Sequence, residues 1–298
     1  MGSQGFRGRF WSGPAILLDA AMGTELQRRG ADTRLPLWSA RALVGSPELV
    51  LAIHKDEVAA GAEVLTANTF RTHRRTLEKA GLGGRSRELT RLAVGLAREA
   101  AEGAGREVFV AGSLSPLEDC YRPDLVPEDE ALEREHRDQA ESLAAAGVDA
   151  ILLETHNTIR ELVAAARAAR ATGLPFVAST VTDGTGRLLS GETIGDAARA
   201  LLPLAPDAIS INCVPAGRLV ADLERLAASA PVPLGAYGNL GLPEDESGWT
   251  FADELSPPAF AAQARRWLAI GARLVGGCCG TTPAHTAALR YAINIASP

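Results

Sequence analysis

The sequence predicts an α/β protein folded as a single (β/α)8 barrel, the TIM-barrel architecture. Eight apolar runs alternate with eight segments of helical pattern, which is the element order of such a barrel. The runs are apolar at nearly every position, as expected of parallel strands buried on both faces. An open, doubly wound sheet is the alternative, but no glycine-rich dinucleotide-binding motif follows the first run.

Each expected strand is a short apolar run, and each expected helix is rich in alanine, leucine, arginine and glutamate at helical spacing. The strands are expected at 15–19, 62–67, 107–112, 148–153, 174–180, 207–212, 232–237 and 271–276. The helices that follow them are expected at about 46–60, 85–103, 128–146, 158–172, 191–203, 216–229, 256–270 and 283–294.

No domain boundary is evident, so the whole chain, 1–298, is expected to form one domain. Residues 1–13 precede the first strand, and we expect them to form a loose N-terminal extension. The segment 238–255 is rich in glycine, proline, glutamate and aspartate. It is too short for a domain and is therefore predicted to be a long loop after the seventh strand.

Composition narrows the classes of function. Hydrophobic residues make up 46% and charged residues 22% of the chain, as in ordinary globular proteins. The net charge of −6 argues against a nucleic-acid partner. No apolar run is long enough to span a membrane, and no secretory signal opens the chain. We therefore expect a cytoplasmic protein whose four cysteines are free thiols or metal ligands. A homo-oligomer is compatible with the sequence.

Polar residues cluster where the expected strands end. In a (β/α)8 barrel the chemistry takes place at this face, because the loops that follow the strands meet there. The residues concerned are Asp19, Asn68, Ser113, Glu154, Asn212, Cys213, Tyr237, Asn239, Cys278 and Cys279. A barrel without a catalytic role would not need this ring of polar groups and thiols.

The three thiols indicate a metal site. Cys278 and Cys279 lie between glycines at the end of the last strand, and Cys213 ends the sixth. Neighbouring side chains of a regular strand point to opposite faces, so both Cys278 and Cys279 face the barrel mouth only if the backbone kinks there. The flanking glycines allow such a kink. Three thiolates on Zn²⁺ leave one tetrahedral position open, as in catalytic zinc sites.

Two other interpretations of the thiols remain open on spacing alone. Free cysteines are often small buried hydrophobic residues. A closed or redox-active site that includes Cys120, in the loop after the third strand, is also possible. Closed zinc sites usually pair their ligands as C-x₂₋₄-C, a spacing that this chain lacks.

Several motifs, in order along the chain, resemble those of the zinc- and homocysteine-binding methyltransferase family. This family includes homocysteine S-methyltransferases that use S-methylmethionine, betaine–homocysteine methyltransferases and the homocysteine domain of cobalamin-dependent methionine synthase. The resemblance extends from Asp19 to about Leu289. The motifs are Asp19-Ala-Ala-Met-Gly-Thr-Glu-Leu26, Leu153-Glu-Thr155, Ser210-Ile-Asn-Cys213, Tyr237-Gly-Asn-Leu-Gly241 and Gly276-Gly-Cys-Cys-Gly-Thr-Thr-Pro283.

The resemblance implies roles for individual residues. Cys213, Cys278 and Cys279 would bind Zn²⁺, and Asn239 would lie close enough to fill the fourth position before substrate arrives. Glu154 would be the catalytic carboxylate that accepts hydrogen bonds from the substrate ammonium group. Backbone amides around Met22, Gly23 and Thr24 would hold the substrate carboxylate. Asp19 would orient this first loop or contact the amino group.

The implied activity is zinc-dependent transfer of a methyl group from a small activated donor to the thiolate of homocysteine, giving methionine. The donor would be S-methylmethionine or an S-adenosylmethionine-like sulfonium, because Thr155 replaces the tyrosine of the betaine-specific branch and no further domain follows the barrel. The partners would thus be a small-molecule thiol and a methyl donor. One alternative is methylation of another thiol, a selenol or a corrinoid partner. A protein that stores zinc or senses redox state is another.

Two further features bear on the donor. The loop 115–123 carries Glu118, Asp119 and Arg122, and is more charged than its counterpart in the family. Trp249 is a candidate to cover a cationic donor with its aromatic face. Four histidines show no metal-ligand spacing, and we expect them to face solvent or to pair locally: His54, His73, His136 and His285. His156 lies near Glu154 and is a candidate to contact the donor, but we expect it to be a solvated histidine of the loop.

Overall fold

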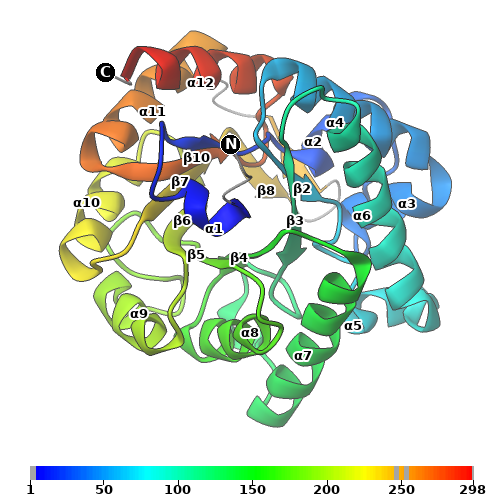
Figure 1. The fold of residues 1–298 in the computed structure, drawn as a ribbon. Coiled ribbons are helices and arrows are strands. Elements are labelled where there is room, and N and C mark those ends of the chain that lie inside the picture. Colours follow the sequence, from blue (N-terminus) through cyan, green and yellow to red (C-terminus); the bar gives the residue numbers. More distant parts are fainter. Residues whose placement is uncertain (1–4, 245–247, 252–254, 297–298) are drawn as a thin grey trace.

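The computed structural model describes residues 5–244, 248–251 and 255–296, and it confirms the barrel. Eight parallel strands surround a central axis and the helices form an outer ring (Figure 1). The strand order is β1-β10-β7-β6-β5-β4-β3-β2. A bridge between Leu18 and Val64 joins the two outermost strands of that order and closes the barrel.

The observed strands match the expected apolar runs to within a few residues. The barrel strands are β1 (Ile16–Leu17), β2 (Val64–Ala67), β3 (Phe109–Leu114), β4 (Ala150–His156), β5 (Phe176–Thr180), β6 (Ala208–Pro215), β7 (Leu234–Asn239) and β10 (Ala272–Gly277). Several strands extend one to three residues beyond the expected end, so the polar residues Ser113, Glu154 and Cys213 belong to the strands themselves.

Eight long helices occupy the expected positions, and shorter ones lie in the loops. The long helices are α4 (Pro47–Ala60), α6 (Ser86–Glu102), α7 (Asp129–Ala146), α8 (Ile159–Ala171), α9 (Ile194–Leu201), α10 (Leu219–Ser229), α11 (Pro257–Ile270) and α12 (Pro283–Ala296). The shorter ones are α1 (Gly5–Arg9), α2 (Met22–Arg28), α3 (Ala42–Gly45), α5 (Arg74–Glu78) and the 3-10 helices η1 (Trp38–Arg41), η2 (Gly83–Arg85), η3 (Pro123–Leu125) and η4 (Leu202–Leu204).

Side chains fill the barrel in layers whose polarity changes along the axis. Near the strand starts the interior is apolar, as at Ala150 and Leu152 of β4. Two residues further along β3 and β4, the residue on the same face is polar, since side chains that share a face recur with a period of two. Glu154 therefore faces the interior above Leu152. Ser113 on β3 and Asn212 on β6 occupy the same level of the buried interior.

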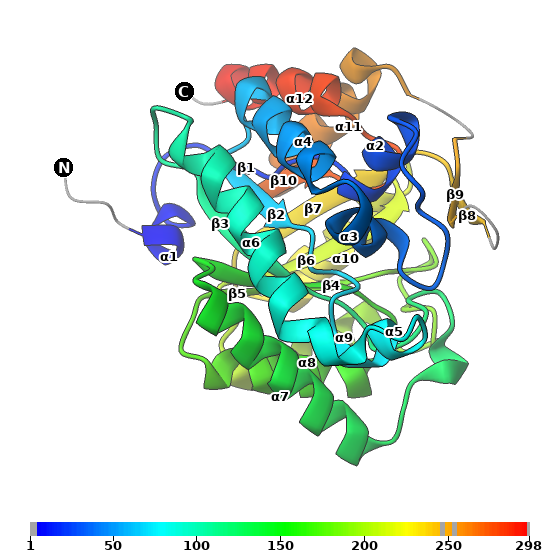
Figure 2. The ribbon, with the colours of Figure 1, turned by 90° about the vertical axis from the view of Figure 1, so that its right-hand side faces the viewer.

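The expected loose N-terminal extension is wrong for the described residues, because α1 packs under the barrel. Phe6 and Phe10 are 3% and 1% exposed. Their rings stack edge-to-face at 5.3 Å, and Phe6 does the same with Phe109 at 5.6 Å. Phe109 begins β3, so α1 covers the amino ends of the strands (Figure 2). Residues 1–4 of the expected extension lie outside the described part of the chain.

The expected long loop 238–255 contains a two-stranded hairpin. Strands β8 (Leu242–Glu244) and β9 (Gly248–Thr250) pair antiparallel, at the end of the barrel opposite α1 (Figure 2). Residues 245–247 and 252–254 of this segment lie outside the described residues. None of the described helices combines the length and the apolar character that a membrane span requires.

Candidate functional site

A cavity of about 310 Å³ opens at the carboxyl ends of the barrel strands. Residues from the loops after β1, β2, β3 and β10 and from the hairpin β8–β9 line it. Of the expected site residues, Asp19, Met22, Gly23, Glu154, Cys213, Cys278 and Cys279 line this cavity. The end of the barrel that the sequence predicted therefore holds a substrate-sized cavity, and most of the expected site residues line it.

The three predicted thiols converge at the cavity wall. The Sγ atoms of Cys213, Cys278 and Cys279 all lie within 4.8 Å of one another. Tetrahedral Zn²⁺ with Zn–S bonds of about 2.3 Å would separate its sulfurs by roughly 3.8 Å. The thiols need to move little to reach that spacing, and they are partly or fully buried. The donor set and its spacing therefore fit a thiolate-bound metal ion.

The tandem cysteines lie in a turn, so the alternation of a strand does not separate their side chains. β10 ends at Gly277, directly before Cys278. Gly280 ends the turn at φ +84°, and a Cβ there would lie 1.9 Å from the Leu240 carbonyl oxygen. Only glycine fits this position. The backbone amides of Cys278 and Leu240 donate to the carbonyls of Gly238 and Cys279, at 2.7 and 2.8 Å, which binds the turn to the end of β7.

Cys213 reaches the same point through an irregularity in β6. The register between β6 and β7 shifts between Asn212 and Pro215, and Cys213 adopts φ +53°. A bulge of this kind redirects a side chain, and a positive φ in a non-glycine residue requires support from its surroundings. The Asn212 amide nitrogen donates to Thr155 Oγ1 at 2.8 Å and lies 4.0 Å from Cys278 Sγ. Asn212 thus connects β6 with β4 and lies beside the cysteine turn.

The mutual repulsion of negative charge on the three sulfurs favours binding of a cation. The neighbouring Cys278 and Cys279 sulfurs lower the pKa of Cys213, whereas the Cys213 sulfur raises the pKa values of both Cys278 and Cys279. The site by itself thus favours one thiolate shared among three sulfurs. A second or third negative charge in this buried position would need a positive ion beside it.

Asn239 lies next to the thiols but is absent from the cavity wall. Its side-chain nitrogen donates to the carbonyl oxygen of Cys213 at 3.3 Å. Its Oδ1 atom is buried and has no hydrogen-bond partner within the described residues. An orphaned buried oxygen is costly, and a metal ion or a substrate N–H would satisfy it.

Glu154 is a buried carboxylate with one strong partner. Ser113 donates to its Oε2 atom, and the side chain is 9% exposed. Burial raises the pKa of Glu154 to about 7, and the nearby Cys213 sulfur contributes in the same direction. Tyr237 also lines the cavity, and hydrogen bonding from its hydroxyl and from Ser113 favours the charged form of Glu154 and so opposes this rise. An ammonium group in the cavity would stabilise the charged form of Glu154.

The first loop is anchored by residues that the sequence assigned to substrate binding. Asp19 accepts hydrogen bonds from the amide and hydroxyl of Thr66, at 2.7 and 2.8 Å, and burial raises its pKa well above the ordinary value. Thr24 is fully buried, and its hydroxyl accepts a hydrogen bond from the Gly280 amide at 2.9 Å. Its side chain therefore supports the cysteine turn and does not line the cavity. The role of the backbone amides stays a prediction.

Gly23 and Met22 line the cavity at the start of α2. A Cβ on Gly23 would lie 2.4 Å from Trp38 Nε1, so the absence of a side chain lets the Trp38 indole approach the backbone. This close packing shapes the cavity wall between the first loop and η1. The glycine thus has a packing role here in addition to any contact with substrate.

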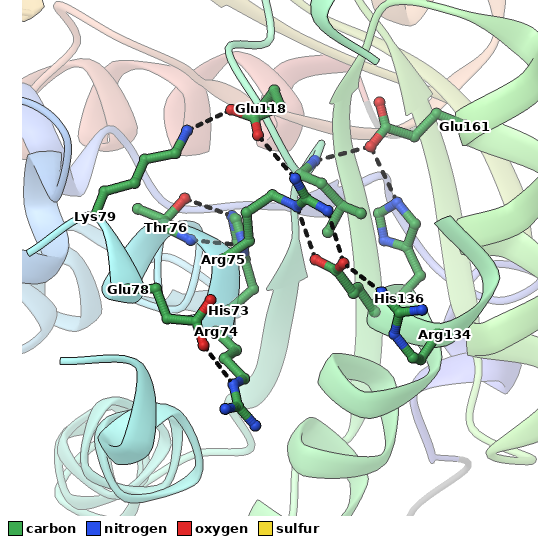
Figure 3. Close-up of polar contacts among 12 residues, drawn as sticks. His73, Arg74, Arg75, Thr76, Glu78, Lys79, Glu118, Arg134, His136 and Glu161 are labelled. Carbon is green, nitrogen blue, oxygen red and sulfur yellow. Dashed lines mark hydrogen bonds and ion pairs between the residues drawn. The ribbon is translucent and has the colours of Figure 1, made fainter. Parts of the chain in front are cut away.

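The loop 115–123 is held from two sides before it passes over the cavity. On its outer side Arg75 and Lys79 both pair with Glu118 (Figure 3). On its inner side the buried Glu161 accepts the Leu117 amide at 2.8 Å. The charged residues of this loop thus have separate tasks, because Glu118 anchors it while Asp119 and Arg122 line the cavity.

Trp249, the expected cover for the donor, lines the cavity and is 2% exposed. Its Nε1 donates to the Leu240 carbonyl oxygen at 2.9 Å, directly beside the cysteine turn. The hairpin β8–β9 therefore brings an aromatic side chain to the thiols. Its contact with a donor stays a prediction.

Expectations for the histidines were partly wrong. His73 and His285 pair locally, with Thr76 and Thr282, as expected. His54, His136 and His156 are buried, because they lie on β4 or on helix faces that pack against the barrel. His136 Nε2 lies 3.1 Å from Glu161 Oε1, and His156 Nε2 lies 3.2 Å from the Leu114 carbonyl oxygen. His156 thus supports the loop after β3 and does not line the cavity.

Comparison with known proteins agrees with this geometry. A family model described as homocysteine S-methyltransferase matches residues 16–293. The chain is 35% identical to the homocysteine S-methyltransferase of Escherichia coli K12, and the match covers 92% of this chain and 94% of that protein. The chain belongs to the homocysteine S-methyltransferase family. It is therefore a methyltransferase, as the motifs predicted.

Other members of the family resemble the chain over most of its length. Homocysteine S-methyltransferase YbgG of Bacillus subtilis is 30% identical, over 91% of each protein. Methionine synthase of Mycobacterium tuberculosis is 33% identical, but the match covers 25% of that longer protein. The crystal structure of the E. coli homocysteine methyltransferase MmuM in its metallated form superposes with a TM-score of 0.83 at 33% identity, covering 96% of this chain and 98% of that one.

Sequence reasoning left several residues of the site without a role. Ser113, Asn212 and Tyr237 were noted only as polar residues at strand ends, although they contact or face Glu154 and the thiols. Arg71, which lines the cavity, was not noticed. Its position directly after Asn68-Thr69-Phe70, at a predicted strand end, was the available signal.

Proposed function

We propose that this enzyme transfers a methyl group from a small sulfonium donor to the sulfur of homocysteine, and that Cys213, Cys278 and Cys279 hold Zn²⁺ for this reaction. The observation that carries the proposal is the convergence of three thiols on the wall of the cavity. Three protein ligands leave one position for an incoming thiol. When bound, Zn²⁺ would lower the pKa of that thiol and so supply a nucleophile at neutral pH.

The residues around the thiols orient the acceptor. Glu154, held by Ser113, binds the ammonium group of homocysteine, and the Tyr237 hydroxyl lies beside Glu154. Backbone amides around Met22, Gly23 and Thr24 bind the carboxylate. Asp19 fixes this loop through Thr66. Asn239 supplies a buried oxygen next to Cys213, and this oxygen would be available to the metal ion before substrate arrives.

The cavity then aligns the donor with the acceptor sulfur. The new bond joins that sulfur to the methyl carbon, while the bond between the methyl carbon and the sulfonium sulfur breaks and its electron pair returns to the donor sulfur. The thiol proton of homocysteine leaves to solvent. The products are methionine and the demethylated thioether. Holding both reactants in one cavity removes much of the entropic barrier.

The test is Cys278→Ala, measured for metal content and for methionine formation from homocysteine and S-methylmethionine. Loss of one of three ligands should reduce both metal affinity and kcat/KM by at least about 100-fold. Cys120→Ala is the matched control. Among the described residues, the group that could bind a metal ion consists of Cys213, Cys278 and Cys279 and does not include Cys120. Full turnover without metal in Cys278→Ala would contradict the proposal. Turnover with other thiols but not with homocysteine would indicate a different acceptor.

A further inference from the structure

Arg71 is a cationic side chain in the cavity that has no anionic partner among the described residues. It follows β2 in the turn that leads to α5, and it lines the cavity together with Phe70. The guanidinium carbon lies 5.7 Å from the centroid of the Phe70 ring. The Nε atom is buried without a hydrogen bond, and among the described residues no ion pair with Arg71 exists. The guanidinium N–H groups of Arg71 therefore have no hydrogen-bond acceptor within the described residues.

Other charged groups of the cavity are already engaged. Arg122, the second basic residue on the wall, pairs with Asp124 through contacts of 2.8 and 2.6 Å. Three acids of the wall accept hydrogen bonds from other residues: Asp19 from Thr66, Glu154 from Ser113 and Asp119 from the Tyr121 amide. Glu244, which also lines the cavity, is engaged as well. Among the described residues no ion pair with any of these acids neutralises Arg71. A ligand that supplies a carboxylate would, since a guanidinium binds a carboxylate through two parallel hydrogen bonds.

The position of Arg71 indicates which of the two substrates it meets. Cys213 and Glu154 belong to strands, β6 and β4, and so lie at the floor of the cavity. Arg71 lies beyond the end of β2, which stands four strands from β6 in the eight-stranded order and hence on the opposite wall. The acceptor at the thiols occupies the floor. The donor must lie above it, within reach of Arg71.

We infer that Arg71 binds the carboxylate of the methyl donor, and that the donor is therefore an amino-acid-type sulfonium with a free carboxylate. The inference rests on the proposed function. In this arrangement the carboxylate end of the donor pairs with Arg71 and its sulfonium methyl group points toward the thiols. The aromatic faces of Phe70 and Trp249 border the same space and suit the positive sulfur.

The experiment compares two donors in wild type and Arg71→Gln, with saturating homocysteine. One donor is S-methylmethionine, and the other is its carboxamide, which keeps the sulfonium and the ammonium but lacks the negative charge. Wild type should use the carboxylate donor with a kcat/KM roughly 10- to 100-fold higher. Arg71→Gln should lose this advantage through a raised donor KM, while the homocysteine KM and the metal content stay unchanged. Arg71→Lys, which keeps the charge, should recover part of it.

Arg74→Gln is the matched control, because Arg74 is an exposed arginine three residues further on that pairs with Glu78 outside the cavity. It should behave as wild type. Equal use of both donors by wild type would overturn the inference. So would an Arg71→Gln variant in which the homocysteine KM rises instead of the donor KM, or in which both donors lose activity equally.

Failure of the proposed function can be recognised separately. If wild type transfers no methyl group to homocysteine, calorimetric titration with the same two sulfonium compounds replaces the kinetic readout. Preferential binding of the carboxylate compound by wild type, lost in Arg71→Gln, would still support the role of Arg71. Equal binding of the two compounds, or binding of neither, would overturn it.

Discussion

Glu154 shows how one residue obtains its chemistry from its position along a strand. Its place two residues after Leu152 directs it into the barrel, above the apolar layers. Burial there raises the pKa of Glu154 to about 7, compared with the ordinary value of 4.5. The carboxylate needed to bind an ammonium group therefore disappears as the pH falls below 7, and an approaching cation favours its return.

We expect the homocysteine KM to rise by roughly fivefold between pH 7 and pH 6, because the ionised fraction of a group with a pKa near 7 falls by that factor. Glu154→Gln should raise the KM at pH 8 by roughly 10- to 100-fold through loss of the charge-assisted hydrogen bonds, and should remove this part of the pH dependence. Steady-state kinetics at a series of pH values provides the measurement. If Glu154→Gln still shows the rise in the homocysteine KM between pH 7 and pH 6, a group other than Glu154 causes that rise.

At the scale of elements, the cysteine turn depends on contacts with segments far away in the sequence. Thr24 on α2 accepts the Gly280 amide, and the end of β7 accepts the Cys278 amide. On the other side of the cavity, the ion pairs of α5 and the buried Glu161 hold the loop after β3 (Figure 3). Short elements that the apolar pattern does not reveal, such as α2 and α5, therefore position the site.

Thr24→Val should weaken the cysteine turn while keeping the shape of the side chain. It leaves the buried Gly280 amide without an acceptor, which costs about 1–3 kcal/mol in the free energy of unfolding. Denaturant titration measures this loss, and competition with a chelator should show faster release of bound metal. Thr24→Ser keeps the hydroxyl and should remain close to wild type in metal release. If both variants release metal alike, the hydrogen bond does not support the turn.

At the scale of the whole molecule, the two ends of the barrel have different tasks. The carboxyl ends of the strands carry the thiols and the cavity, and the amino ends are closed by α1. Phe6 on α1 and Phe10, the residue directly after this helix, belong to the apolar interior at that end of the barrel. Stability and chemistry are thus separated along the barrel axis.

Phe10→Ala should therefore reduce stability without affecting catalysis. Loss of a fully buried phenylalanine costs about 3–5 kcal/mol in the free energy of unfolding. The KM for homocysteine, measured well below the melting temperature, should not change. Trp11→Ala is the control, since Trp11 is 72% exposed and its removal should cost no more than about 0.5 kcal/mol. A stability of Phe10→Ala equal to that of wild type would show that α1 does not contribute to the barrel.

The sequence by itself determined the order of the eight strand–helix units, the family, and the end of the barrel at which Glu154 and the thiols lie. These features follow from local patterns, namely apolar runs, helical spacing and residues at strand ends, and each is legible within a short stretch of chain. The long helices match for the same reason, because their apolar faces repeat at helical spacing.

The tertiary structure alone decided which residues meet. The bulge that directs Cys213 to Cys278 and Cys279, the burial of His136 and His156, and the contact of Thr24 with Gly280 all depend on closure of the barrel. Pairings across such distances leave no periodic trace in the sequence. Arg71 is the clearest case, because its lack of a partner can be recognised only when the positions of the other charged side chains are known.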